Sequence, residues 1–213
     1  PDPVSLVTLM GAPQPVNDYD VARDQAPVVA DRVHVQLLNA LERVPTNLLA
    51  VRFPGIDAVG HRFLRYADPS AFGDVSREER ERYGNVLMQY YGFIDTLIGR
   101  ELDRLGPDDL LLVVSAFGRE PMTPGKRVLE LMAGNRAISG THERAPDGFV
   151  LAFGPPVAAG RPARASVVDL APTILYYLGL PVGRDMDGFA RTDWFKPAFT
   201  SDKPVTYIPS YGR

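Results

Sequence analysis

The chain has 213 residues, a formal net charge of −3 and no cysteine. The lack of cysteine excludes a disulfide scaffold, an iron–sulfur cluster, a thiolate zinc site and a cysteine nucleophile. The near-neutral charge argues against a nucleic-acid polymer as partner, because such a protein needs a basic face to neutralise phosphates. No apolar run approaches the roughly 18 residues of a membrane span. The first residue is Pro1 rather than Met, which indicates a processed or trimmed product.

The first quarter of the chain predicts a strand, a linker, a helix and a second strand. Residues 4–10 form a short apolar run followed by Gly and Pro, which is typical of a strand and a loop. From about 28 to 44, apolar residues recur every three or four positions and predict a helix. The run 48–53 (LLAVRF) ends at Pro54 and predicts a buried strand.

The rest of the chain alternates between helical and strand patterns. Ser76 and Glu79 have the spacing of a capping box and predict the start of a long helix that continues to about Leu105. Residues 110–114 and 149–153 predict buried strands, and helices are expected over 124–133 and 167–178. The tail after Gly183 has no periodicity.

This alternation predicts an α/β fold, with a mostly parallel sheet covered by helices on both faces in a three-layer α/β/α sandwich. We expect a leading strand and linker over residues 1–26, the α/β domain over 27–193 and an extended tail over 194–213. Ligands bind such sheets at the carboxyl ends of the strands. Candidate site residues are therefore expected after Phe53, after Val114 and after the short helix near Met132.

The best metal-ligand candidates are a carboxylate and two imidazoles. Asp57 and His61 are four residues apart, so one turn of helix would place them on the same face. His142 lies in the loop that enters the strand predicted over 149–153, whereas His34 lies beside an apolar stripe and is interpreted as structural. Asp57, His61 and His142 could form a three-ligand site with an open coordination position. On the residues alone, ordinary surface or core histidines remain the alternative.

Four segments, in order, resemble motifs of the alkaline phosphatase superfamily, most closely its type I phosphodiesterase/nucleotide pyrophosphatase branch. They are residues 54–61 (PGIDAVGH), 115–118 (SAFG), 139–149 (SGTHERAPDGF) and 167–175 (VVDLAPTIL), the last followed by Gly179 and Asp187-Gly188. The resemblance covers about residues 27–193. It favours a phosphatase-like site over a non-haem iron site, which would use the same two imidazoles and one carboxylate.

The resemblance implies that Asp57, His61 and His142 bind one metal ion, usually zinc, which holds a phosphoryl oxygen during displacement. Zinc is the expected cofactor, although another divalent cation would suit the same donors. Arg144 and Arg119 lie beside the motifs and could contact phosphate. For Arg119 we favour the interpretation of a solvated loop residue.

Two departures from the family pattern weaken the expected chemistry. The segment 115–118 (SAFG) has Ala116 and Phe117 where the family has the Asp and His of a second metal site. Neither side chain offers a lone pair to a cation. The nucleophile of the family has no counterpart in this chain. The expected function is therefore a metal-dependent phosphoric-ester hydrolase with one metal site, and the alternative is a catalytically inactive metal- or ligand-binding module of the same fold.

The resemblance also sets expectations about partners and location. The expected ligand is a small phosphate ester. If the sheet of the family begins before Pro1, the first strand would leave an open apolar edge, which predicts contact with a missing amino-terminal segment or with another copy of the chain. The location expected from the resemblance is outside the cytoplasm, either periplasmic or secreted.

Overall fold

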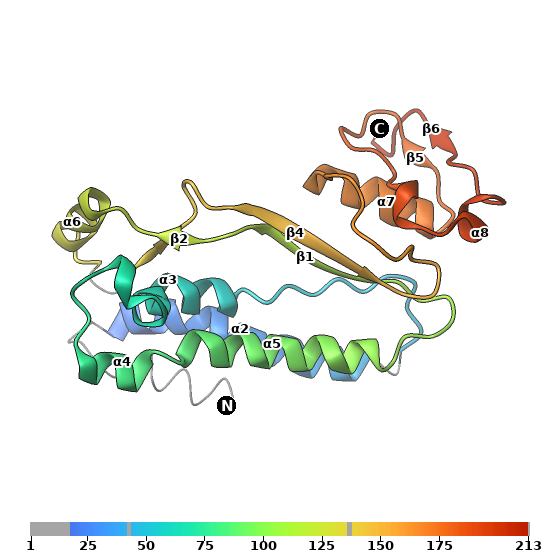
Figure 1. The fold of residues 1–213 in the computed structure, drawn as a ribbon. Helices are drawn as coiled ribbons and strands as arrows, with labels where there is room; N and C mark the ends of the chain where they lie inside the picture. The colour runs from blue at the N-terminus through green and yellow to red at the C-terminus, as the bar shows by residue number, and fades with distance from the viewer. Residues whose placement is uncertain (1–17, 42–43, 136–137, 213) are drawn as a thin grey trace. The chain divides into compact units, whose positions relative to one another are not determined.

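The computed structural model describes residues 18–41, 44–135 and 138–212 (Figure 1). The strand expected over residues 4–10, with the apolar edge it would leave, lies outside the described residues. The chain divides into two compact units. Unit 1 comprises the described residues within Pro1–Ile98 and Phe117–Asp147. Unit 2 comprises those within Gly99–Ala116 and Gly148–Arg213.

Unit 1 is mainly helical. Its helices are α2 (Asp18–Leu41), α3 (Gly55–Ala67), α4 (Arg77–Tyr83), the greater part of α5 (Val86–Leu102) and α6 (Pro124–Met132), with a short 3-10 turn η1 (Pro69–Ala71). Two short strands, β2 (Glu120–Pro121) and β3 (Gly140–Thr141), pair antiparallel. This pairing brings His142, the residue after β3, next to Gly118, the second residue before β2.

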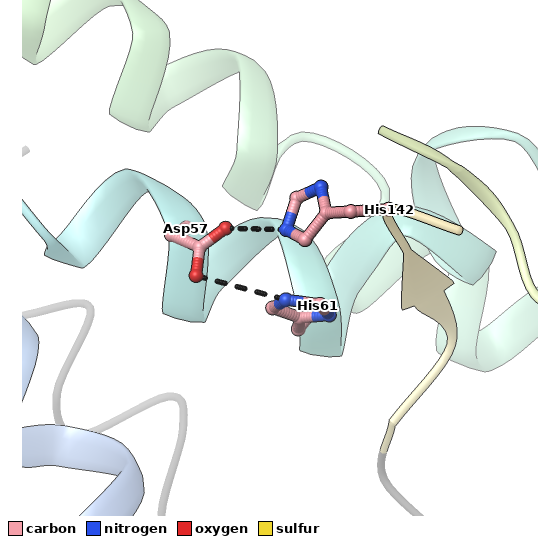
Figure 2. Close-up of side chains that lie close together, drawn as sticks. All are labelled: Asp57, His61 and His142. Atoms are coloured by element: carbon pink, nitrogen blue, oxygen red, sulfur yellow. Dashed lines mark hydrogen bonds and ion pairs between the residues drawn. The ribbon is translucent and has the colours of Figure 1, made fainter. Parts of the chain in front are cut away.

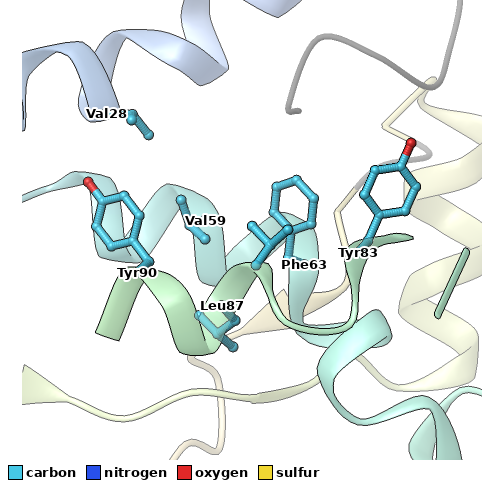
Figure 3. Packing of buried hydrophobic residues seen from close by; sticks show 7 residues of the cluster. Val28, Val59, Phe63, Tyr83, Leu87 and Tyr90 are labelled. Atoms are coloured by element: carbon cyan, nitrogen blue, oxygen red, sulfur yellow. The ribbon is translucent and has the colours of Figure 1, made fainter. Parts of the chain in front are cut away.

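The core of unit 1 forms where four helices contribute apolar side chains to one cluster (Figure 3). Val59 and Phe63 are one turn apart on α3, so both face the same way. The cluster also contains residues of α2, α4 and α5, and its buried members are Val28, Val59, Phe63, Tyr83, Val86, Leu87 and Tyr90. This core fixes the position of α3.

A buried carboxylate holds the first residue of α3. Asp31 of α2 is fully buried and accepts hydrogen bonds from the Gly55 N–H, at 3.1 Å, and from the Tyr90 hydroxyl, at 2.5 Å. Burial raises the pKa of Asp31, although both hydrogen bonds oppose that shift. The carboxyl group satisfies a donor that the helix itself leaves unpaired, and so anchors the start of α3 to two other helices.

Two expectations for unit 1 are wrong in detail. Residues 48–53 are extended but belong to no strand, and Leu48 is 58 % exposed. No strand in the described part of the chain pairs with this segment, so its apolar run is not buried in a sheet. The expected long helix is two helices: α4 ends at Tyr83, with Gly84 as its C-cap, and α5 begins at Val86. The capping box of Ser76 and Glu79 is confirmed.

Unit 2 contains most of β1 (Leu111–Phe117) and β4 (Asp147–Phe153), which pair with each other. It also contains η2 (Val167–Asp169), α7 (Leu170–Tyr177), η3 (Thr192–Trp194), α8 (Pro197–Thr200) and the parallel pair of β5 (Val182–Gly183) and β6 (Tyr207–Ile208). Its core is the aromatic cluster of Tyr176, Trp194 and Phe195.

The chain is therefore a mixed α/β protein, as the sequence predicted. The helices expected over 124–133 and 167–178 and the strands expected over 110–114 and 149–153 are confirmed to within a few residues. The expectation that these two strands are buried is wrong, because Val114, Phe149 and Leu151 are 45, 54 and 47 % exposed. Each sheet formed by the described residues has two strands. No helix in this part of the chain combines the length and the hydropathy that crossing a bilayer requires.

Candidate metal centre

The site begins on the first two turns of α3. Asp57 lies in the first turn, where a negative charge interacts favourably with the helix dipole. His61 follows one turn later on the same face, and its Nε2 lies 3.6 Å from Asp57 Oδ2 (Figure 2). The prediction that the four-residue spacing brings these two side chains together is confirmed.

The second imidazole comes from the segment after β3. His142 follows Thr141, and its Nε2 lies 2.9 Å from Asp57 Oδ1 (Figure 2). Ser139 holds this segment against α3, because its N–H and its hydroxyl both donate to the His61 carbonyl, at 2.7 and 3.0 Å. Ser139 is only 1 % exposed, so this link is shielded from water.

Backbone carbonyls fix the orientation of both imidazole rings. His61 Nδ1 lies 2.7 Å from the Gly140 carbonyl oxygen, and His142 Nδ1 lies 2.6 Å from that of Gly118. A carbonyl can only accept, so each Nδ1 carries a proton. Metal-binding histidines are commonly oriented by such a hydrogen bond from the second ring nitrogen. The Asp57 carboxylate also only accepts, so His142 Nε2 donates to it across the 2.9 Å contact and would lose that proton on binding a metal.

The three side chains offer a compact set of donors. One ligand atom from each of Asp57, His61 and His142 lies within 4.8 Å of the other two, and all three residues are half-buried. Two imidazole nitrogens and a carboxylate oxygen are a donor set that zinc accepts with one position left open. The group could therefore hold a metal ion, and several divalent cations would suit these donors.

An arginine is part of the same site. Arg119 Nη2 forms an ion pair with Asp57 Oδ1, and the Arg119 side chain is 16 % exposed. A side chain at Gly60 would overlap the Arg119 guanidinium, and a Cβ at Gly140 would lie 2.7 Å from Arg119 Cδ. The two glycines thus leave the space that Arg119 fills. The interpretation of Arg119 as a solvated loop residue is wrong, because its guanidinium is mostly buried and bonds to Asp57 and to the Ile56 carbonyl of α3.

The charges of the site favour the forms that bind cations. Burial raises the pKa of Asp57, but the His61, Arg119 and His142 groups outweigh burial and hold it below its ordinary value. Burial lowers the pKa of His61, which the Gly140 carbonyl partly opposes. Near neutral pH, Asp57 is ionised and His61 is neutral, and these are the forms in which both groups bind metals.

The other residues singled out in the sequence lie beside or outside the triad. Arg144 is exposed, and its backbone N–H donates to Glu120 Oε1 at 2.6 Å. Ala116 and Phe117 end β1, and the Phe117 ring lies 4.4 Å from the His142 ring. His34 lies outside the triad, with its Nδ1 2.6 Å from the Arg52 carbonyl oxygen.

Sequence reasoning missed the supporting residues Asp31 and Ser139 and misjudged Arg119. The only sequence signal for Arg119 was the pair of glycines, Gly60 and Gly140, beside two candidate ligands. Asp31 had no signal, since nothing in a helical pattern distinguishes a buried carboxylate from a solvated one.

No protein family, no curated protein and no solved structure matches this chain. The resemblance to the alkaline phosphatase superfamily therefore stays a prediction.

Proposed function

We propose that Asp57, His61 and His142 bind one divalent metal ion, zinc, and that the chain acts on a phosphoric ester at this ion. The observation that carries the proposal is the orientation of the two imidazoles. Both Nδ1 atoms are hydrogen-bonded to backbone carbonyls, and both Nε2 atoms lie near the Asp57 carboxylate. Three donors held in this way resemble a metal site that retains an open position for a ligand.

Zinc at this site would polarise a phosphoryl oxygen and stabilise the negative charge that develops on phosphorus. The residues of the chain would supply the rest of the binding. Gly118 and Gly140 keep the rings aligned through their carbonyls, and Arg119 places a fixed positive charge beside Asp57. Guanidinium groups form strong charge-assisted hydrogen bonds to phosphate, so Arg119 is suited to contact a second oxygen of the ester.

The proposed activity belongs to the type I phosphodiesterase/nucleotide pyrophosphatase kind of hydrolase, and the proposed architecture is a three-layer sandwich that extends the paired strands β1 and β4. The sequence motifs at residues 54–61, 115–118, 139–149 and 167–175 support both. The nucleophile is not assigned to a residue of this chain.

Zinc titration by calorimetry, after dialysis against a chelator, tests the metal site. One equivalent of zinc is expected to bind. Loss of a residue that only supports a metal ligand lowers metal affinity roughly 10- to 100-fold, and Asp57→Asn and His142→Ala should each lower zinc affinity by more than that, because they alter ligands. His34→Ala is the matched control, because that histidine lies outside the triad, and its zinc affinity should be unchanged. Less than a tenth of an equivalent bound by the unaltered chain would contradict the proposal.

A second candidate is a binding module of the same fold without turnover. It is favoured by Ala116 and Phe117, which cannot ligate a second cation, and by the Arg119 guanidinium, which occupies one Asp57 oxygen. Assays with nitrophenyl phosphodiesters and monoesters discriminate between the two candidates. Zinc-dependent turnover that is lost in His142→Ala supports the hydrolase, whereas zinc binding without turnover supports the module.

A further inference from the structure

A cavity of about 440 Å³ adjoins the triad within unit 1. Residues of α3, α6 and β3 line it, and His61 is part of its wall. Thr141, another lining residue, directly precedes His142 in the chain. The volume lies in the range of pockets that bind small molecules. His61 is therefore the member of the triad that the candidate metal site and this cavity share.

The wall of the cavity is partly apolar and partly charged. Ala58, Met122 and Ile138 supply apolar surface, and Met122 is only 5 % exposed. The charged residues of the lining are two cations, Arg62 and Lys126, and one anion, Glu130. Glu143, which is not part of the lining, pairs with Lys126, so a negative group on a ligand would have to replace that carboxylate.

Glu130 is already engaged, because its Oε2 accepts a hydrogen bond of 2.7 Å from the Asn135 side-chain amide. Its charge is therefore partly satisfied within the wall of the cavity.

Lys126 is the cation best placed to meet a ligand. Its Nζ lies 3.3 Å from Thr141 Oγ1 and forms an ion pair with Glu143. The Glu143 side chain is 62 % exposed, against 28 % for Lys126. An ion pair with so exposed a partner contributes little to stability. An anionic group that enters the cavity can therefore replace Glu143, which then returns to water.

We propose that the cavity binds the organic part of a small phosphate ester, and that a carboxylate on that part pairs with Lys126. The proposal rests on the proposed function, since it places the phosphoryl group at the triad. The apolar wall would cover the carbon chain between the two charged ends. The ligand class is thus a small phosphorylated carboxylic acid rather than a neutral alkyl phosphate.

Two phosphonates of equal shape test this class without being hydrolysed. 3-Phosphonopropanoate ends in a carboxylate, and 3-methylbutylphosphonate replaces that carboxylate by an isosteric isopropyl group. Calorimetry on the zinc-loaded chain should show about tenfold tighter binding of 3-phosphonopropanoate, as expected for one charge-assisted hydrogen bond.

Three lysine variants locate the origin of that preference. Lys126→Met keeps the length of the side chain and should abolish the preference, while Lys126→Arg keeps the charge and should retain it. Lys196→Met is the matched control, because Lys196 is an exposed lysine of unit 2 whose Nζ donates to the Pro155 carbonyl. This control should bind both phosphonates as the unaltered chain does.

The outcomes separate the two proposals. If zinc binds but the unaltered chain does not distinguish the phosphonates, or Lys126→Met still does, the cavity proposal is overturned and the metal centre stands. If zinc does not bind, the proposed function fails, and the same two phosphonates are titrated into the metal-free chain. A preference that depends on Lys126 would then uphold the cavity as a carboxylate site, and its absence would overturn that as well.

Discussion

At the scale of single residues, the site depends on which donor atoms of each side chain remain available for a metal ion after its hydrogen bonds are made. The hydrogen bonds to the Gly118 and Gly140 carbonyls use one nitrogen of each imidazole and leave the other facing Asp57. Asp57 divides its oxygens, since Oδ1 contacts His142 and Arg119 while Oδ2 lies near His61. Arg119 therefore competes with a cation for one of the donor atoms.

Arg119→Ala should raise the affinity of the triad for zinc. Removing the guanidinium takes one of two partners from Asp57 Oδ1, which His142 still contacts, and removes a positive charge that repels the ion. Because Asp57 is 44 % exposed and partly screened by solvent, we expect a gain of roughly tenfold. Competition with a zinc-binding dye measures it. Unchanged or weaker zinc binding would show that the ion pair does not compete with the metal.

The residues of the triad could be predicted, but their neighbours could not. Asp57 and His61 share a helix, so their spacing sufficed, and His142 was placed with them by motif order. Arg119 is 62 residues from Asp57 in sequence. No periodicity carries information over that separation, and an arginine in a loop usually faces water.

At the scale of elements, α3 carries the site and is fixed from three sides. Asp31 of α2 holds its first residue, the apolar cluster holds its buried face, and Ser139 holds its middle turn to β3. Gly60 lies in this helix, where glycine costs about 1 kcal/mol relative to alanine. Its position against Arg119 explains why a helix former is not found there.

Gly60→Ala should displace Arg119 rather than unfold α3, since the atom it meets is the end of a long side chain. We expect zinc affinity to rise as in Arg119→Ala, and the gains of the two substitutions not to add in the double variant. A double-mutant cycle of zinc affinities measures this. Additive gains would mean that Gly60 and Arg119 act independently.

Several elements were predicted close to their observed bounds. α6, α7, β1 and β4 were found, and so was the capping box that begins α4. The apolar run 48–53 was misassigned because burial of a strand depends on neighbours that a local pattern does not show. The break between α4 and α5 was missed because no proline lies between Ser76 and Leu105, and a glycine such as Gly84 does not by itself end a helix.

At the scale of the whole molecule, the described residues form two units with separate cores. The triad and its cavity belong to unit 1. Unit 2 has its own buried carboxylate, because Asp169 accepts hydrogen bonds of 2.9 Å from the backbone N–H groups of Ser166 and Phe189. Arg191 lies 3.7 Å from the same carboxylate.

Lowering the pH should reduce the stability of unit 2, because it protonates the Asp169 carboxylate. The two backbone hydrogen bonds, with help from Arg191, lower the pKa of this carboxyl group in the folded chain. A lowered pKa contributes stability above the unfolded value of about 3.9, and that stability is lost as the pH falls through the folded value. Asp169→Asn should cost about 1–3 kcal/mol at neutral pH and reduce the acid dependence.

Urea unfolding between pH 2 and pH 7, followed through amide signals of α7, measures the effect of Asp169→Asn. Asp202→Asn is the control, because Asp202 is an exposed residue of the same unit and should leave the pH profile unchanged. An Asp169→Asn variant with the acid dependence of the unaltered chain would contradict the assigned role of this carboxylate.

X-ray absorption at the zinc edge tests the central claim most directly, because it reports the atoms that surround the ion. The zinc-loaded chain should show two imidazole nitrogens and at least one carboxylate oxygen at about 2.0–2.2 Å. His142→Ala should remove one imidazole from that shell. A zinc shell with fewer than two imidazoles in the unaltered chain, or one that His142→Ala leaves unchanged, would contradict a site built from Asp57, His61 and His142.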